Sequence, residues 1–287
     1  MMKSKKKLLC ISLTCLPLLL ASCGNSQNTP EPTPEPESKK EEREVIDPVI
    51  PTKTVSELAE NEYNKVPLYY LSKLGTYKSY KAVTKGDTVA QFLFIKVTQS
   101  IDVTVIKGED YSYMMNESHS SQINTSHECW YHTEEAVYRD NGETNYHHIS
   151  MENYLNKYGT EPFEIAMEGY RISEKSIKAV TKLESEENYK FKVEFNPDEA
   201  SKYVTIQMKQ FGGLDAYPII AGVEMVVTLK NDFTPLQLDL TSQYTAQKLV
   251  STSCTQNYTV TYSNYGETLE IPGLNEAKPH FNDPLEK

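Results

Sequence analysis

The side chains best suited to chemistry are four histidines and one cysteine that lie close together in the sequence: His127, Cys129, His132, His147 and His148. In a strand, successive side chains point to opposite faces, so His127 and Cys129 would share one face. An imidazole and a thiolate on one face are ligands for zinc and copper. The sequence has no His-x-His pair, however, and the adjacent His147 and His148 would face opposite ways. We therefore expect histidines on the solvent-exposed face of a sheet and no metal site.

The sequence contains no recognisable signature of catalysis. It has no G-x-S-x-G elbow, no H-E-x-x-H pair and no glycine-rich phosphate loop. These motifs place a nucleophile, a metal or a phosphate in a fixed geometry. Without them, we expect neither an enzyme nor a bound cofactor.

Cys129 and a second cysteine, Cys254, fall in segments with strand character. In an exported protein a disulfide between them would persist, and closing so long a loop would stabilise the fold by about 4 to 5 kcal/mol. The alternative is two separate buried thiols, because sequence does not show whether the two residues lie close together. Both alternatives stay open at this stage.

The charge of the chain excludes one class of partner. The 287 residues include 40 acidic and 29 basic side chains, which gives a formal net charge of −11. Four of the basic residues are lysines that precede residue 8, so the remainder is more acidic still. A protein that binds nucleic acid neutralises phosphates with a basic surface. We expect no nucleic-acid partner.

The N-terminus has the pattern of a secretory signal. The four lysines precede an apolar run from Leu8 to Leu20, and two small residues follow it. The run is shorter than the roughly 20 apolar residues of a membrane-spanning helix, and it contains Pro17. We expect residues 1–22 to be a signal peptide.

The end of this signal, Leu20-Ala21-Ser22-Cys23, resembles the bacterial lipobox. The resemblance implies that the signal is cut before Cys23 and that Cys23 carries a thioether-linked diacylglycerol, which would hold the protein on the membrane. Gly24 follows the cysteine where an aspartate would favour retention on an inner membrane. This implies an extracytoplasmic lipoprotein on a Gram-positive surface.

Composition divides the mature chain into two parts. Residues 23–54 begin with Cys23, are rich in proline and glutamate, and hold too few apolar side chains for a core, so we expect a disordered tether. All 20 tyrosines and the single tryptophan follow this stretch. We expect residues 55–287 to form one β-rich domain.

The pattern of apolar residues in that domain predicts antiparallel strands with a few helices. Proline, glycine and capping residues mark helices over 55–64, 67–75, 151–159, 162–170 and 200–211. Alternation of β-branched and aromatic residues marks strands over 77–84, 89–97, 101–106, 111–115, 127–132, 136–139, 176–183, 189–195, 223–229, 236–244 and 255–262. Lys85-Gly86-Asp87, Lys107 to Asp110 and Asn141-Gly142 are the expected turns. Helices gathered on one face of such a sheet make an α+β fold.

The closing segment from Val260 to Pro272 resembles the last strand of a family of bacterial lipoproteins, the LolA-like and LppX or LprG-like proteins. The shared features are an aromatic residue, an asparagine, a second aromatic residue and a glycine, in Tyr262, Asn264, Tyr265 and Gly266. The resemblance implies a curved antiparallel sheet, an open half-barrel wrapped over a few helices. It also implies a cavity that takes a lipid or another apolar ligand without covalent chemistry.

The residues expected to line that cavity are apolar positions in the strands and helices: Leu71, Phe92, Phe94, Val103, Val105, Met114, Val193, Met208, Met225 and Val227. An alternative function is a tethered module that binds an envelope protein or a glycan without a ligand cavity. Tyrosine outnumbers phenylalanine by 20 to 8 and suits a protein interface, which favours this alternative.

Overall fold

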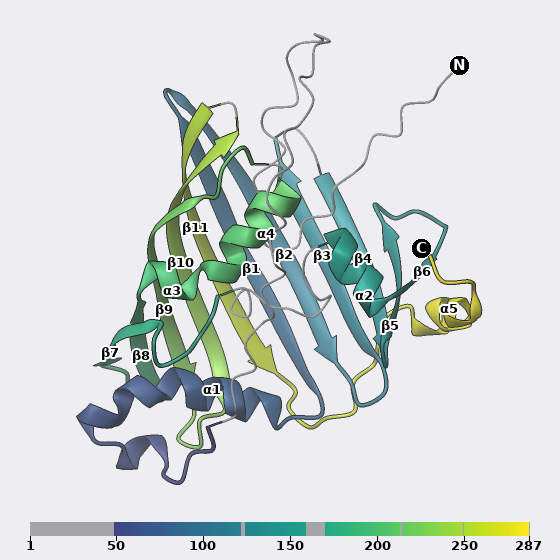
Figure 1. Cartoon of the computed structure of the whole chain (residues 1–287). Coiled ribbons are helices and arrows are strands. Elements are labelled where there is room, and N and C mark those ends of the chain that lie inside the picture. The colour runs from purple at the N-terminus through teal and green to yellow at the C-terminus, as the bar shows by residue number, and fades with distance from the viewer. Residues whose placement is uncertain (1–48, 122–123, 159–169, 213, 249, 287) are drawn as a thin grey trace.

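The computed structural model describes residues 49–121, 124–158, 170–212, 214–248 and 250–286. It contains an antiparallel sheet of eleven strands (Figure 1). The strands are β1 (Tyr80–Phe92), β2 (Ile95–Lys107), β3 (Ser112–Ser120), β4 (Asn124–His132), β5 (Glu135–Asp140), β6 (His147–Ser150), β7 (Ile177–Leu183), β8 (Tyr189–Phe195), β9 (Ile219–Leu229), β10 (Pro235–Lys248) and β11 (Val250–Ser263).

Two meanders make up this sheet. Strands β1 to β6 lie side by side in chain order, and so do β7 to β11. Strand β1 pairs with β11, which gives the order β6-β5-β4-β3-β2-β1-β11-β10-β9-β8-β7. The pairing of β1 with β11 joins Lys81 to Ser263 and Gln91 to Ser253. Strands β6 and β7 are the two edges and do not pair with each other. The sheet is therefore open, and the expected α+β half-barrel is confirmed.

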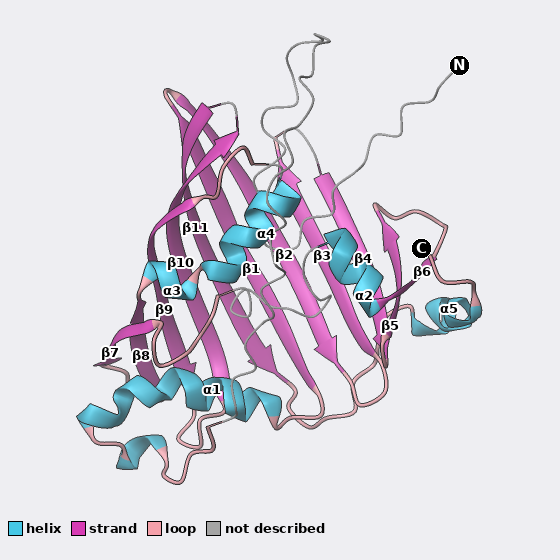
Figure 2. Cartoon of the chain, viewed as in Figure 1, coloured by secondary structure: helices cyan, strands magenta, loops and turns pink. Residues whose placement is uncertain are grey.

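The larger helices lie on one face of the sheet, which we call the inner face (Figure 2). The helical elements are η2 (Val55–Glu57), η3 (Glu60–Lys65), α1 (Val66–Gly75), α2 (Met151–Tyr158), α3 (Pro197–Ala200), α4 (Lys202–Gly212), α5 (Leu274–Ala277) and η4 (Lys278–Asn282). Helix α1 crosses the end of the sheet at which β1 begins (Figure 1). Pro67 stands in its first turn, where a missing N–H costs nothing. The expected helix 162–170 lies almost entirely outside the described residues.

Alternation along the strands separates the two faces. In β1, Tyr80, Ala82, Thr84 and Thr88 are buried on the inner face, and the residues between them are more exposed. These positions form the main core together with the inner faces of β2, β8, β9, β10 and β11 and with buried residues of α1 and α4. The helices therefore cover an apolar wall.

The expected turn at Lys85-Gly86-Asp87 was wrong. Strand β1 runs straight through these residues, and the hairpin turns instead at Leu93 and Phe94, where Phe92 pairs with Ile95. Gly86 serves a different purpose: a Cβ at this position would overlap the carbonyl oxygen of Asn257 and the ring of Tyr258. Here glycine makes room for a neighbouring side chain.

A second, smaller core lies on the outer face and is covered by the end of the chain. Trp130 is buried there with Ile106, Tyr113 and Val137, beside partly buried apolar residues between Leu269 and Phe281. The indole Nε1 of Trp130 donates to the carbonyl oxygen of Pro272 at 2.7 Å. The C-terminal residues thus stabilise the side of the sheet that the inner helices do not reach.

None of the helices in the described ranges is long and apolar enough to cross a membrane.

Candidate functional site

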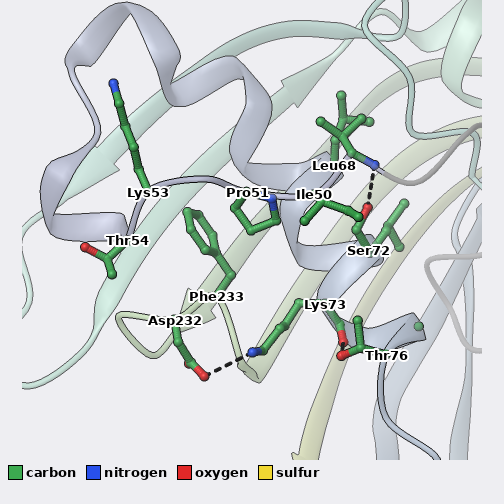
Figure 3. A pocket seen from close by; sticks show the side chains of 13 residues that line it. Ile50, Pro51, Lys53, Thr54, Leu68, Ser72, Lys73, Thr76, Asp232 and Phe233 are labelled. Atoms are coloured by element: carbon green, nitrogen blue, oxygen red, sulfur yellow. Dashed lines mark hydrogen bonds and ion pairs between the residues drawn. The ribbon is translucent and has the colours of Figure 1, made fainter.

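A cavity lies between α1, the turn that joins β9 to β10, and the segment that leads into η2 (Figure 3). Its volume is 690 Å³. The lining residues are Val49, Ile50, Pro51, Lys53, Thr54, Leu68, Leu71, Ser72, Lys73, Gly75, Thr76, Asp232 and Phe233. The volume falls in the range of pockets that hold small organic ligands, about 300 to 1,000 Å³.

One wall of the cavity is the segment 49–54, which we call the entry segment. At one end the backbone N–H of Val49 donates to Ser72 Oγ on α1 at 2.9 Å. At the other end Val55 N–H donates to the carbonyl oxygen of Asn231 at 2.8 Å. These two bonds hold the entry segment against α1 and the β9–β10 turn.

The interior of the cavity is mainly apolar. Leu68 and Leu71 come from α1, three residues apart and hence on one face of the helix. Phe233 is buried at a positive φ of 65° in the β9–β10 turn and packs edge-on against Tyr69 at 4.9 Å between ring centroids. The ring of Phe233 therefore gives the cavity an aromatic surface on the side of the β9–β10 turn.

Charges of both signs stand at its mouth. Lys73 Nζ lies 3.2 Å from Asp232 Oδ2 (Figure 3). Partial burial by itself raises the pKa of Asp232, but hydrogen bonds from Thr234 and the charge of Lys73 lower it below its ordinary value. Asp232 is therefore an ionised carboxylate at neutral pH.

The hydroxyl groups in the wall are already engaged. Ser72 accepts from Val49, Thr76 Oγ1 donates to the carbonyl oxygen of Lys73 at 2.7 Å, and Thr54 Oγ1 donates to Glu57 Oε2 at 2.8 Å. Ser72 and Thr76 pair with backbone groups, and the carboxylate that accepts from Thr54 also accepts from the backbone N–H of Thr54, as in the capping box of a helix. The arrangement can hold a ligand by contact and charge.

Of the ten residues expected to line a cavity, Leu71 does so. Seven others are buried in the main core: Val103, Val105, Met114, Val193, Met208, Met225 and Val227. Phe92 is half-buried at the end of β1, and Phe94 is fully exposed at the hairpin turn. Phe94 was expected between sheet and helices because the sequence pattern did not reveal the turn.

A row of polar side chains also crosses the inner face, on neighbouring strands and in direct cross-strand register: Ser242, Gln256, Thr88, Gln99 and Ser120. Ser242 Oγ donates to Gln256 Oε1 at 2.9 Å. The Nε2 of Gln256 is buried and has no hydrogen-bond partner in the structure. Apolar side chains lie on either side of this row, so the row interrupts the apolar surface of the inner face.

The expectation that the histidines lie on a solvent-exposed face was wrong for two of them, whereas His132 and His147 are half-buried and His119 is exposed. His127 and His148 are buried. His127 Nδ1 lies 2.7 Å from Asp140 Oδ1, and its Nε2 lies 2.7 Å from the hydroxyl of Tyr154 on α2. The reason is that α2 covers His127 on the inner face, whereas the C-terminal segment covers His148, whose Nδ1 lies 2.7 Å from the carbonyl oxygen of Asp283. No group of three metal-binding side chains occurs among the residues described.

Cys129 and Cys254 are both free and buried. They lie on β4 and β11, with β3, β2 and β1 between them. At a strand spacing of about 4.8 Å this separates them by roughly 19 Å, far beyond the Cα separation of about 7 Å that a disulfide permits. Of the two alternatives, the structure has the separate thiols.

The tyrosines form no exposed face. Of those whose side chains the structure describes, only Tyr217 is exposed. Several of the others pack against one another, as Tyr70 and Tyr80 do against Tyr262. The abundance of tyrosine, which favoured an interaction module, is explained by a core made of aromatic rings.

Two comparisons of the sequence returned nothing: no protein-family model and no curated protein matches this chain.

Solved structures do match, with low similarity. A domain assigned to outer membrane lipoprotein sorting in Vibrio parahaemolyticus has 10% identity and a TM-score of 0.24, and the match covers 76% of this chain and 98% of that one. A DUF1329 family protein from Desulfovibrio piger has 8% identity and a TM-score of 0.27, over 78% and 97%. A LolA superfamily protein from Nitrosomonas europaea has 7% identity and a TM-score of 0.23, over 78% and 96%. At these TM-scores the likenesses carry no argument, and the half-barrel rests on the strand order and register.

Proposed function

We propose that this chain is a membrane-anchored extracytoplasmic lipoprotein that binds a lipid or another apolar ligand non-covalently, as a carrier or chaperone. The observation that carries this proposal is the 690 Å³ cavity, with an apolar interior and an ion pair at its mouth. The ligand site is thus the space beneath α1, and the core between sheet and helices serves as its scaffold.

The cavity favours an amphiphile. Leu68, Leu71 and Phe233 offer an apolar surface that an aliphatic chain covers without losing hydrogen bonds. Lys73 and Asp232 at the mouth can pair with a polar headgroup of either sign. A polar solute would leave its own polar groups without hydrogen-bond partners against this wall, which disfavours sugars and nucleotides.

Anchoring is the second part of the proposal and concerns residues outside those described. Residues 1–22 are the signal peptide, Cys23 carries the lipid, and the chain from Gly24 to residue 48 is the tether. Residues 49–54, which we assigned to the tether from their composition, pack against α1 as the entry segment. The tether therefore ends at the wall of the cavity.

The proposal is tested by asking what the purified protein carries. Native mass spectrometry and lipid extraction of the mature chain should recover a bound amphiphile. Leu71→Trp places a bulky ring in the cavity and should reduce the recovered lipid, whereas Leu285→Trp, at an exposed site beside the edge strand β6, should not. Equal lipid in both variants, or none in the unmodified protein, would contradict a ligand site beneath α1.

The anchor has its own test. The protein made in a lipoprotein-processing host should partition into detergent and should gain the mass of a diacylglycerol at Cys23. Replacing Cys23 by alanine should abolish both. An unmodified Cys23 in the mature protein would contradict the anchor and leave the ligand site untouched.

A further inference from the structure

Exposed apolar side chains gather at one end of the sheet. Seven large apolar residues are exposed in the described part of the chain, and five of them lie at this end: Leu93, Phe94, Ile95, Tyr217 and Ile219. The register shows that they belong to one end, because Ile219 pairs with Thr245, Thr245 with Ser253, and Ser253 with Gln91. Figure 1 shows this end opposite the end that α1 crosses.

The most prominent of them form the turn between β1 and β2, which we call the apolar tip. Leu93, Phe94 and Ile95 are 70%, 101% and 63% exposed. They are consecutive, and the last ladder pair before the turn is Phe92 with Ile95, so Leu93 and Phe94 extend beyond the sheet. The tip is convex and cannot enclose a ligand.

The tip also violates the ordinary chemistry of a tight turn. Leu93 has a φ of 51°, a conformation that glycine and asparagine adopt at lower cost than leucine. Two-residue turns between exposed strand ends ordinarily carry polar residues. A strained, apolar turn that is largely exposed indicates a partner at this position.

The charges next to the apolar tip indicate which kind of partner it contacts. From Thr88 to Ile101 the sequence contains no acidic residue, although the whole chain contains 40. The single charge in this stretch is Lys96, one residue after the tip. An apolar protrusion followed by a cation matches the boundary between acyl chains and anionic headgroups.

We propose that the apolar tip inserts into the surface of a lipid bilayer. This rests on the proposed function only in that a lipid anchor already holds the chain at a membrane. Insertion of the tip orients the half-barrel with its α1 end, and therefore the cavity, away from the surface.

The length of chain outside the structure permits this orientation. The described residues begin at Val49, which is bonded to α1. Strand β1 has 13 residues, so the tip lies about 43 Å from the α1 end at 3.3 Å per residue. The 25 residues from Gly24 to residue 48 can span up to about 80 Å. A lipid on Cys23 and the tip can therefore enter the same bilayer.

The test uses the mature chain from Cys23 to Lys287, made without the lipid so that binding by the fold itself is measured. Sedimentation with vesicles of phosphatidylglycerol and phosphatidylcholine should recover the protein. Phe94→Asp should lower the apparent affinity for vesicles by about tenfold or more, because a carboxylate resists entry into the apolar layer. Leu285→Asp, at an exposed apolar site outside this end, should leave it unchanged.

A second measurement covers the case in which Phe94→Asp folds poorly. In Phe94→Trp, lipids brominated on their acyl chains should quench the fluorescence of the new tryptophan. They should not quench Trp130, because that ring is buried. Vesicle binding that is absent, or equal in Phe94→Asp and the unmodified chain, would overturn the proposal. The proposal would also be overturned if Phe94→Asp changed only the oligomeric mass, because the tip would then be an interface between copies of this chain. Lipid recovered from the cavity is measured separately. Failure of the proposed ligand site is therefore distinguished from failure of the tip to bind vesicles.

Discussion

The Nδ1 of His147 lies 2.5 Å from Oε1 of Glu286, although 139 positions separate the two residues in the sequence. Glu286 also accepts a hydrogen bond from the hydroxyl of Tyr138 at 2.8 Å, and its backbone N–H donates to the carbonyl oxygen of His148 at 2.7 Å. The end of the chain thus covers the backbone of the edge strand β6. An edge strand with unpaired backbone groups invites pairing with other chains, and this contact protects it.

Replacing Glu286 by glutamine should make the stability of the protein less dependent on pH in acid. Partial burial by itself raises the pKa of Glu286, but hydrogen bonds from His147 and Tyr138 and the charge of Lys157 bring it below its ordinary value of 4.5. A carboxylate with a lowered pKa stabilises the fold above its unfolded-state pKa, and that contribution is lost as the pH falls through the folded-state pKa. Glu286→Gln should therefore cost about 1 kcal/mol at pH 7 and progressively less below pH 4.5.

The free energy of unfolding in urea at several pH values measures this effect. Glu186→Gln, in an exposed turn, is the matched control and should follow the unmodified protein at every pH. A Glu286→Gln curve parallel to that of the unmodified protein would show that the contact with His147 does not contribute to stability.

Gly86→Ala should destabilise the sheet at its centre. A methyl group there would overlap the backbone carbonyl of Asn257 and the ring of Tyr258, and backbone in the middle of a sheet cannot move aside. We expect a loss of about 2 kcal/mol or more in the free energy of unfolding. In Gly222→Ala, where the new methyl group meets no atom within 4 Å, the change should stay within about 0.5 kcal/mol. Similar losses in the two variants would mean that the close approach of Asn257 and Tyr258 to Gly86 does not determine the loss.

The single tryptophan should report whether the C-terminal segment is docked. Trp130 is buried against that segment, and its indole N–H is bonded to Pro272. Leu274→Asp puts a charge into this contact and should shift the emission of Trp130 to longer wavelength, because water then reaches the ring. Ile219→Asp, which is remote from Trp130, should leave the emission unchanged. An unshifted spectrum in Leu274→Asp would mean that other residues bury the ring.

The two thiols should be unreactive in the folded protein. Burial raises the pKa of Cys254 to about 12 and raises that of Cys129 as well, so neither forms the thiolate that reacts. Ellman's reagent should modify both only after unfolding. An intact mass lower by the two hydrogens of a disulfide would contradict the free thiols.

Local patterns predicted most of the strands and helices. Alternation of apolar residues correctly placed β8, β9 and β11, and Pro67 and Gly75 correctly bounded α1. The hairpin of β1 and β2 was missed because a glycine occurs both in turns and at positions where another segment approaches the backbone closely. Lys85-Gly86-Asp87 reads as a turn, but the glycine is needed for its close contact with Tyr258, a residue far along the chain.

The candidate site was less predictable than the fold. Leu71 was identified because it lies on the apolar face of α1, but the entry segment has the composition of a tether and gives no local signal of packing. Phe233 was missed because it stands in a turn next to polar residues. Phe233 lines the cavity because of its positive φ and because of where α1 lies. A short stretch of sequence predicts neither of these.

By itself, the sequence determined the class of architecture, because alternation at a period of two and the positions of proline and glycine are local properties of the chain. It also determined the net charge, from which we expect no nucleic-acid partner, and the expected lipid attachment at Cys23. Tertiary structure decided that Cys129 and Cys254 lie four strands apart, that His127 is buried, and that Glu286 reaches β6. The physical reason is the same in each case: register and the packing of distant segments are set by contacts summed over the whole sheet, and no local pattern records them.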